Sequence, residues 1–170
     1  VPARPPGRGR GGGDSGAAGV IGFSIAHRRE PNGALVDPVS GGTVPAQTDD
    51  GKLAVLAARP DSRCNGQVGS VGGSAGGYHT AFAAATGTPG EDRIDAGVSL
   101  SGAYDLSDSS FDPNIATFID DATNYVNVPS TDIAALRVAS PAYLADSMPA
   151  PLFPMHPDDA QTPFRQLGDA

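Results

Sequence analysis

The sequence predicts an α/β fold with parallel strands, and three observations lead to it. Short apolar runs alternate with helical stretches along the chain, which is the pattern of consecutive βαβ units. A length of 170 residues with 39% hydrophobic residues suffices for a buried core. A G-x-S-x-G sequence at 72–76 follows one apolar run and precedes a helical stretch, as expected where a strand turns sharply into a helix.

Four apolar runs are the expected strands. Residues 20–25 form a nearly continuous run, as expected of a strand buried on both faces. The runs at 68–71, 94–100 and 152–155 follow in order. Pro154 lies inside the last run and cannot donate a backbone hydrogen bond, which favours pairing on one side only.

Three helical stretches lie between or after these runs. A helix is expected from Thr48 or Asp49, either of which can cap it, to about Arg59. An alanine-rich helix is expected over 78–86, and a short one near 132–138. The apolar positions of the first helix are Leu53, Val55 and Leu56.

Composition limits the function classes and the domain organisation. Residues 1–19 are rich in Gly, Pro and Arg and are expected to be a flexible tail, with one partial domain over 20–170. Eleven basic and 19 acidic residues give a net charge of −8, which argues against nucleic-acid binding. No stretch approaches the ~20 apolar residues of a membrane span. Cys64 is the single cysteine, so neither an internal disulfide nor a cysteine-rich zinc site can form. We expect no metal or organic cofactor.

Ser74, the central residue of the G-x-S-x-G sequence, is the candidate nucleophile. A serine at such a turn adopts strained backbone geometry and projects its hydroxyl above the sheet edge, so Gly72 and Gly76 must be small. The N–H of Ala75 then faces the place where an oxyanion would form. Glycine is frequent here (23 of 170 residues), so the pattern gains its weight from the strand before it and the helix after it. A phosphate-binding turn is the alternative, but neither nucleotide-binding fingerprint is present.

Several further segments stand in the order seen in one family. The chain resembles α/β-hydrolase-fold serine esterases of the carboxylesterase and lipase group from about Val20 to Gln166. The resemblance implies a three-layer α/β/α sandwich with a mostly parallel sheet, here truncated. It also implies hydrolysis of a small-molecule carboxylic ester through a serine acyl-enzyme. The matching segments are His27 to Pro31, Pro45 to Asp50, Val71 to Gly77, Ile94 to Asp105, Ser140-Pro141 and Ala150 to His156.

The resemblance also implies roles for individual residues. Asp159 lies four residues before Pro163 and matches the acid of the family's triad, with Asp158 as the alternative. Arg10 to Gly13 is similar to the family's His-Gly-Gly-Gly, which completes the oxyanion hole. The residues that would line the oxyanion hole with Ala75 are Gly12 and Gly13, and those near the substrate pocket are Tyr78, Tyr104 and Asp105.

The histidine base is the missing part. In this fold it follows the acid along the chain, and no histidine follows Asp159 here. His27 is expected to be structural, His79 is expected to point away from the Ser74 hydroxyl, and His156 is the weak remaining candidate. We therefore expect the base beyond this sequence, so that the chain alone is inactive. A non-catalytic binding protein that keeps the tight turn at 72–76, the nucleophile elbow, only as a vestige is the alternative.

Overall fold

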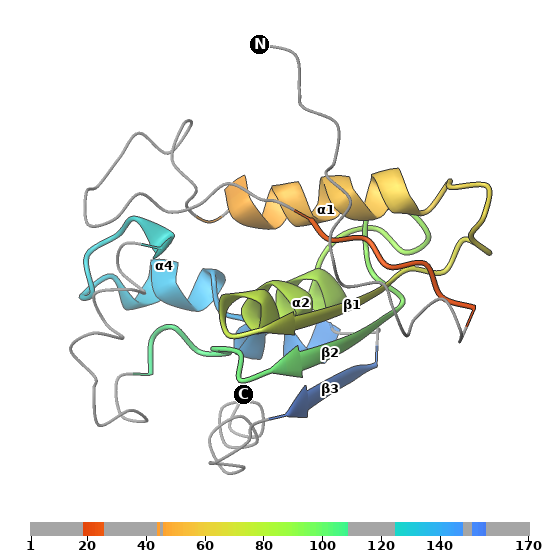
Figure 1. Ribbon diagram of the computed structural model, residues 1–170. Helices are drawn as coiled ribbons and strands as arrows, with labels where there is room; N and C mark the ends of the chain where they lie inside the picture. The colour runs from red at the N-terminus through yellow and green to blue at the C-terminus, as the bar shows by residue number, and fades with distance from the viewer. Residues whose placement is uncertain (1–18, 26–43, 45, 109–124, 148–150, 156–170) are drawn as a thin grey trace.

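The computed structural model describes residues 19–25, 44, 46–108, 125–147 and 151–155, with strands and helices alternating from β1 to β3 (Figure 1). This order confirms the predicted α/β class. The elements are α1 (Ala46–Ala58), β1 (Gly69–Gly73), α2 (Ala75–Ala85), β2 (Ala96–Leu100), α4 (Ile133–Val138), the 3-10 helix η2 (Pro141–Ser147) and β3 (Leu152–Met155).

The three strands form a fully parallel sheet in the order β1-β2-β3. Val71 of β1 lies beside Val98 of β2, which in turn lies beside Phe153 of β3. Because parallel strands end at the same edge, the end of β1 lies next to the end of β2, with Gly73 opposite Leu100. The chain passes at this edge from β1 into α2.

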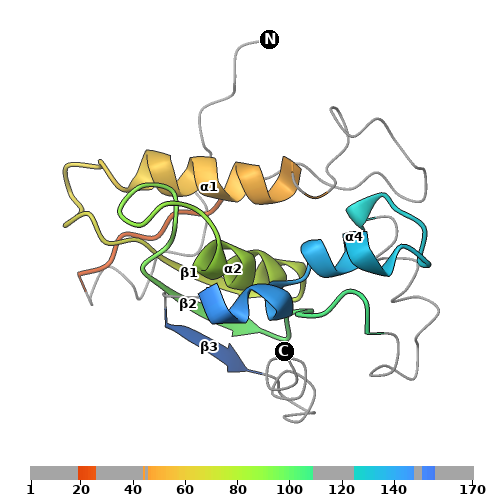
Figure 2. The same cartoon turned by 180° about the vertical axis from the view of Figure 1, so that it is seen from behind.

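Helix α2 covers one face of the sheet and is the centre of the core. It lies on the same face as η2, the blue helix after α4 (Figures 1 and 2). Small residues allow the close approach: a Cβ at Gly97 of β2 would lie 2.8 Å from the Thr80 methyl of α2. The core clusters that α2 joins are Tyr78 with Leu106, Leu136 and Ala139; Ala81 with Tyr104 and Ala142; and Ala84 with Val55 and Ile94.

The opposite face of the sheet is apolar and open to solvent. Val71 is 73% exposed and Phe153 is 69% exposed, on either side of the half-buried Val98. The described residues therefore supply the sheet and one helical layer of the expected three-layer sandwich.

Residues 20–25 do not form the predicted strand. They carry no strand assignment, and Val20, Phe23 and Ile25 are each at least 50% exposed. A strand requires a neighbouring backbone, and within the described stretches no backbone–backbone hydrogen bond joins 20–25 to another segment. The prediction of a buried strand at this apolar run is therefore wrong.

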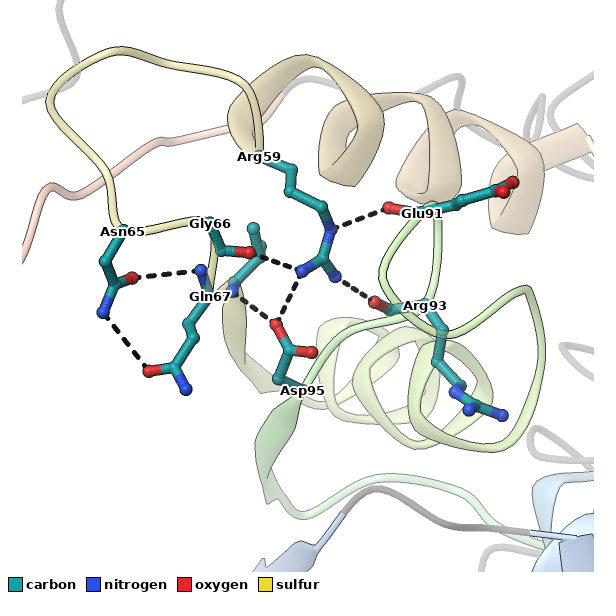
Figure 3. A network of polar contacts seen from close by, with 8 residues as sticks. Arg59, Asn65, Gly66, Gln67, Glu91, Arg93 and Asp95 are labelled. Atoms are coloured by element: carbon teal, nitrogen blue, oxygen red, sulfur yellow. Dashed lines mark hydrogen bonds and ion pairs between the residues drawn. The ribbon is translucent and has the colours of Figure 1, made fainter.

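Arg59, at the end of α1, ties together the amino-terminal ends of β1 and β2 (Figure 3). Its guanidinium donates to the carbonyl oxygens of Gly66 (2.5 Å), Glu91 (2.9 Å) and Arg93 (2.5 Å), and to Asp95 Oδ2 (2.9 Å). Asp95 Oδ2 also accepts from the Val68 N–H at 2.8 Å. Partial burial opposes ionisation of Asp95, but these hydrogen bonds and the charge of Arg59 lower its pKa below the usual value.

Candidate active site

Ser74 stands at the junction of β1 and α2 in a strained conformation. Its φ of 54° and ψ of −119° lie in a region that residues with a Cβ rarely adopt. The surrounding backbone holds it there: the Ser74 N–H donates to the Leu100 carbonyl at 2.8 Å, and the Ser74 carbonyl accepts from Gly77 at 2.9 Å and Tyr78 at 3.1 Å. The turn is therefore fixed both to the neighbouring strand and to the first turn of the helix.

The Ser74 side chain is left available for chemistry. The residue is exposed, and its hydroxyl makes no capping hydrogen bond to α2. A serine at a helix start normally caps the helix by accepting from a backbone N–H. The strained backbone of Ser74 turns the hydroxyl away from that task and toward solvent.

The glycines around Ser74 are explained by close backbone contacts. A Cβ at Gly72 would collide with the carbonyl group of Gly76 and lie 2.9 Å from its Cα. A Cβ at Gly77 would lie 2.8 Å from Ser99 Oγ and 2.9 Å from the Leu100 carbonyl oxygen. At Gly76 an added Cβ would meet nothing within 4 Å, so the predicted requirement for a small residue applies to Gly72 and not to Gly76.

The start of α2 provides donors for an anion. The first N–H groups of a helix have no acceptor within the helix, and the helix dipole adds partial positive charge there. Ala75 and Gly76 are the first two residues of the 11-residue helix α2, directly after Ser74. Their N–H groups can stabilise an oxyanion that forms on an acyl group attached to Ser74 Oγ.

His79 is engaged away from Ser74. Its Nε2 lies 3.1 Å from Gln47 Oε1 and 2.6 Å from the Tyr125 hydroxyl, and its ring contacts both Tyr78 and Tyr125 edge-on. In the part of the chain that the structure describes, no hydrogen bond joins His79 to Ser74. This geometry agrees with the expectation that His79 points away from the Ser74 hydroxyl.

Of the remaining predicted site residues, some lie among the described residues and others do not. Those that lie outside the described residues are Gly12, Gly13, His27, His156, Asp158 and Asp159. Tyr78 is buried, its hydroxyl donates to the Ala139 carbonyl at 2.8 Å, and burial raises its pKa well above the usual value. Its proposed place near the pocket stays a prediction.

Tyr104 and Asp105 follow the end of β2, beside the elbow. Tyr104 is fully buried, and its hydroxyl donates to Ser99 Oγ at 2.7 Å; burial raises its pKa. Asp105 is half-buried and accepts from the Tyr143 hydroxyl at 3.0 Å and from the Ser107 hydroxyl at 2.6 Å. The resemblance placed both residues near the substrate pocket, but nothing in the sequence pointed to Ser99, whose hydroxyl lies between Tyr104 and α2.

Comparisons with known proteins support the fold. The chain is similar to Pyrococcus horikoshii acylaminoacyl peptidase, at 24% identity and a TM-score of 0.54 over 73% of this chain and 21% of that one. An acylaminoacyl peptidase in complex with Z-Gly-Gly-Phe-chloromethyl ketone gives 24% identity and a TM-score of 0.52, with the same coverage. These proteins are serine hydrolases of the α/β-hydrolase fold. This chain shares that fold.

The likeness covers only part of those proteins. The chain spans about a fifth of the length of these solved structures, so the similarity concerns one part of a larger molecule. They are peptidases, and they give no support to the carboxylesterase and lipase group in particular. No protein-family model and no curated protein matches the sequence.

Neither a membrane span nor a metal site is found among the described residues. No helix among them has the length and apolar character needed to cross a bilayer. No group of three or more histidine, cysteine, aspartate or glutamate side chains in these same segments is arranged to hold a metal ion.

Proposed function

We propose that this chain carries the nucleophile of a serine hydrolase and that Ser74 attacks the acyl carbonyl of a carboxylic ester. The observation that supports this most strongly is the conformation of Ser74. A non-glycine residue with φ of 54° costs on the order of 1–3 kcal/mol. Strain of this kind is concentrated at functional sites. Here it presents an exposed hydroxyl at the start of a helix.

The proposed reaction has two acyl transfers. Ser74 Oγ forms a bond to the carbonyl carbon while its proton passes to a histidine base, and the N–H of Ala75 stabilises the resulting oxyanion. The bond to the alcohol then breaks, and the histidine returns the proton to the departing alcohol oxygen. Water then attacks the acyl carbon and passes a proton to the histidine. The bond to Ser74 Oγ breaks, and the histidine returns the proton to Ser74 Oγ as the acid is released. Asp159 would orient the histidine, and Gly12 and Gly13 would add oxyanion donors.

A second candidate substrate is the bond to an N-acylated amino acid. The structural likeness to acylaminoacyl peptidases favours it. The nucleophile and the oxyanion donors would be the same, and only the leaving group would change from an alcohol to an amine. The acidic net charge of −8 disfavours anionic substrates of either class.

Covalent labelling of the 170-residue chain tests the proposal. A fluorophosphonate reacts with an activated serine by displacement of fluoride. The described residues place no histidine at Ser74, so imidazole is added as the base. General-base catalysis is typically worth 10²–10⁴-fold in a formed site. For a diffusible base we expect about a tenfold gain in labelling at Ser74, mapped by peptide mass spectrometry.

Two variants control this experiment. Ser74→Ala should abolish the imidazole-dependent label, whereas Ser130→Ala removes another exposed serine and should leave it unchanged. If Ser74 labels no faster than Ser130, the proposal is wrong and the vestigial-elbow alternative is favoured. Without imidazole, we expect the chain to hydrolyse short esters no faster than its Ser74→Ala form.

Acyl transfer from matched substrates separates the two substrate classes. A p-nitrophenyl ester and the p-nitroanilide of an N-acylated amino acid are each supplied with imidazole, and acylated Ser74 is measured by mass. Acylation by the ester alone supports ester hydrolysis. Comparable acylation by both would favour the peptidase, because amides are intrinsically far less reactive than activated esters.

A further inference from the structure

A chain of buried hydroxyl groups runs beneath the elbow. The Tyr104 hydroxyl donates to Ser99 Oγ at 2.7 Å, and Ser99 Oγ donates to the Gly77 carbonyl at 2.9 Å. Ser99 and Tyr104 are both fully buried. Gly77 belongs to the first turn of α2, and its N–H donates to the Ser74 carbonyl at 2.9 Å. The hydrogen bonds therefore connect Tyr104, through β2, to the backbone of the nucleophile.

The space around Ser99 is filled by backbone. A Cβ would lie 2.8 Å from Ser99 Oγ if added at Gly77, and 2.6 Å if added at Gly102. The hydroxyl thus occupies a slot between the start of α2 and the loop that follows β2. The next residue, Leu100, accepts from the Ser74 N–H at 2.8 Å. Two successive residues of β2 hold the elbow, Ser99 through its side chain and Leu100 through its carbonyl.

Core stability alone does not require these hydroxyl groups. The Gly77 carbonyl lies in α2, where the helical ladder offers it the N–H four residues later. A pair of buried hydroxyls contributes little net stability compared with apolar groups of the same shape. What the Ser99 bond adds is a fixed position of the first helical turn relative to β2. That position sets where the Ala75 N–H lies with respect to Ser74 Oγ.

We infer that Ser99 and Tyr104 are positioning residues of the nucleophile elbow, with Ser99 holding the first turn of α2 and Tyr104 orienting the Ser99 hydroxyl. The inference rests on the proposed function of Ser74 for its catalytic meaning. Its structural part can be measured independently. Neither residue is proposed to touch the reacting atoms.

The test compares Tyr104→Phe, Ser99→Ala and the double variant of the full chain. Amide hydrogen exchange of residues 74–78, the imidazole-dependent labelling rate of Ser74 and the thermal midpoint are measured on each. Ser99→Ala removes both the hydrogen bond from the Tyr104 hydroxyl and the hydrogen bond to the Gly77 carbonyl, so it should lower the midpoint most. The double variant removes both groups and should regain part of that loss.

A positioning role and a merely structural role of Ser99 predict different results for the double variant. A positioning role predicts exchange about three- to tenfold faster, and labelling slower by a similar factor, in both Ser99→Ala and the double variant. A merely structural role predicts that exchange and labelling recover together with the midpoint, and that result would overturn the inference. Tyr104→Phe, which keeps the Ser99 bond to Gly77, should show a smaller effect on both readouts.

Ser140→Ala is the matched control. Ser140 is also fully buried, and it donates to the Leu136 carbonyl at 2.7 Å and accepts from the Leu106 N–H at 2.8 Å, so neither of these hydrogen bonds goes to α2. The Ser140→Ala variant should be less stable than the parent chain, but its amide exchange at residues 74–78 and its labelling at Ser74 should be unchanged. If the parent chain fails to label at Ser74, the proposed function fails, while the exchange data still decide whether Ser99 holds the elbow.

Discussion

Substitution of Gly72 by alanine probes the elbow at its most crowded point. The added Cβ would collide with the Gly76 carbonyl and lie 2.9 Å from the Gly76 Cα. Backbone atoms cannot rotate aside, so the start of α2 must move, by ~0.5 Å even to relieve the milder of these contacts. Overpacking of this kind costs about 1–3 kcal/mol. We expect a loss of stability in that range, together with loss of the imidazole-dependent labelling of Ser74.

Gly69 is the matched control on the same strand. A Cβ there would lie 3.5 Å from the Ala96 carbonyl oxygen, which is an ordinary contact. Because alanine also restricts the unfolded chain, Gly69→Ala should be neutral or slightly stabilising, within about 1 kcal/mol. Urea unfolding measures both variants. Equal stabilities of Gly72→Ala and Gly69→Ala would refute the claim that the elbow requires glycine at 72.

Two further predictions concern strain and pH. Ser74→Gly should raise stability by about 1 kcal/mol because glycine adopts φ of 54° without strain, whereas Ser74→Ala keeps the Cβ and should not; urea midpoints of the two variants check this. Because the pKa of Asp95 is lower in the folded chain than its usual value of 3.8, ionised Asp95 stabilises the fold at pH values above 3.8. This contribution is lost as the pH falls below 3.8. Asp95→Asn should therefore flatten the dependence of stability on pH between about 5 and 3, and an unchanged slope would contradict the role of the Arg59 network.

The elements with strong local signals were predictable from the sequence. Residues 152–155 form β3 as predicted, and Pro154 lies on a strand that pairs with β2 alone among the described strands. The tight turn at Ser74 was predictable because an apolar run precedes the G-x-S-x-G sequence and a helical stretch follows it. The helix after it begins at Ala75 and not at Tyr78, since the turn itself consists of the single residue Ser74.

The sequence was a poor guide to features that depend on tertiary contacts, such as which side chains of a helix are buried. Of the three apolar positions that the sequence shows in α1, only Val55 is buried, while Leu53 is 60% exposed and Leu56 is 45% exposed. Val55 packs with Ala84 and Ile94, and the other buried residues of α1 are Gln47, Thr48 and Ala58. Apolar character alone therefore does not show which residues of this helix are buried.

In the candidate site, the tight turn at Ser74 was predictable from the sequence, and the role of Ser74 as a nucleophile stays a prediction. Tyr104 was placed near the substrate pocket by resemblance, and in the structure it lies beneath the elbow, linked to it through Ser99. Ser99 could not be found from the sequence, because a serine in an apolar strand has no pattern that marks a buried hydroxyl. Only the structure shows its surroundings, because Gly77 and Gly102 are far apart in the chain and both approach the Ser99 hydroxyl in space.

The central claim is that the strained turn makes Ser74 a nucleophile. The most direct measurement is the ratio of fluorophosphonate labelling at Ser74 to that at Ser130, determined as imidazole is raised. We predict that this ratio exceeds one and increases with imidazole concentration, and that the Ser74 signal disappears in Ser74→Ala. A ratio that stays at one at every concentration would contradict the claim.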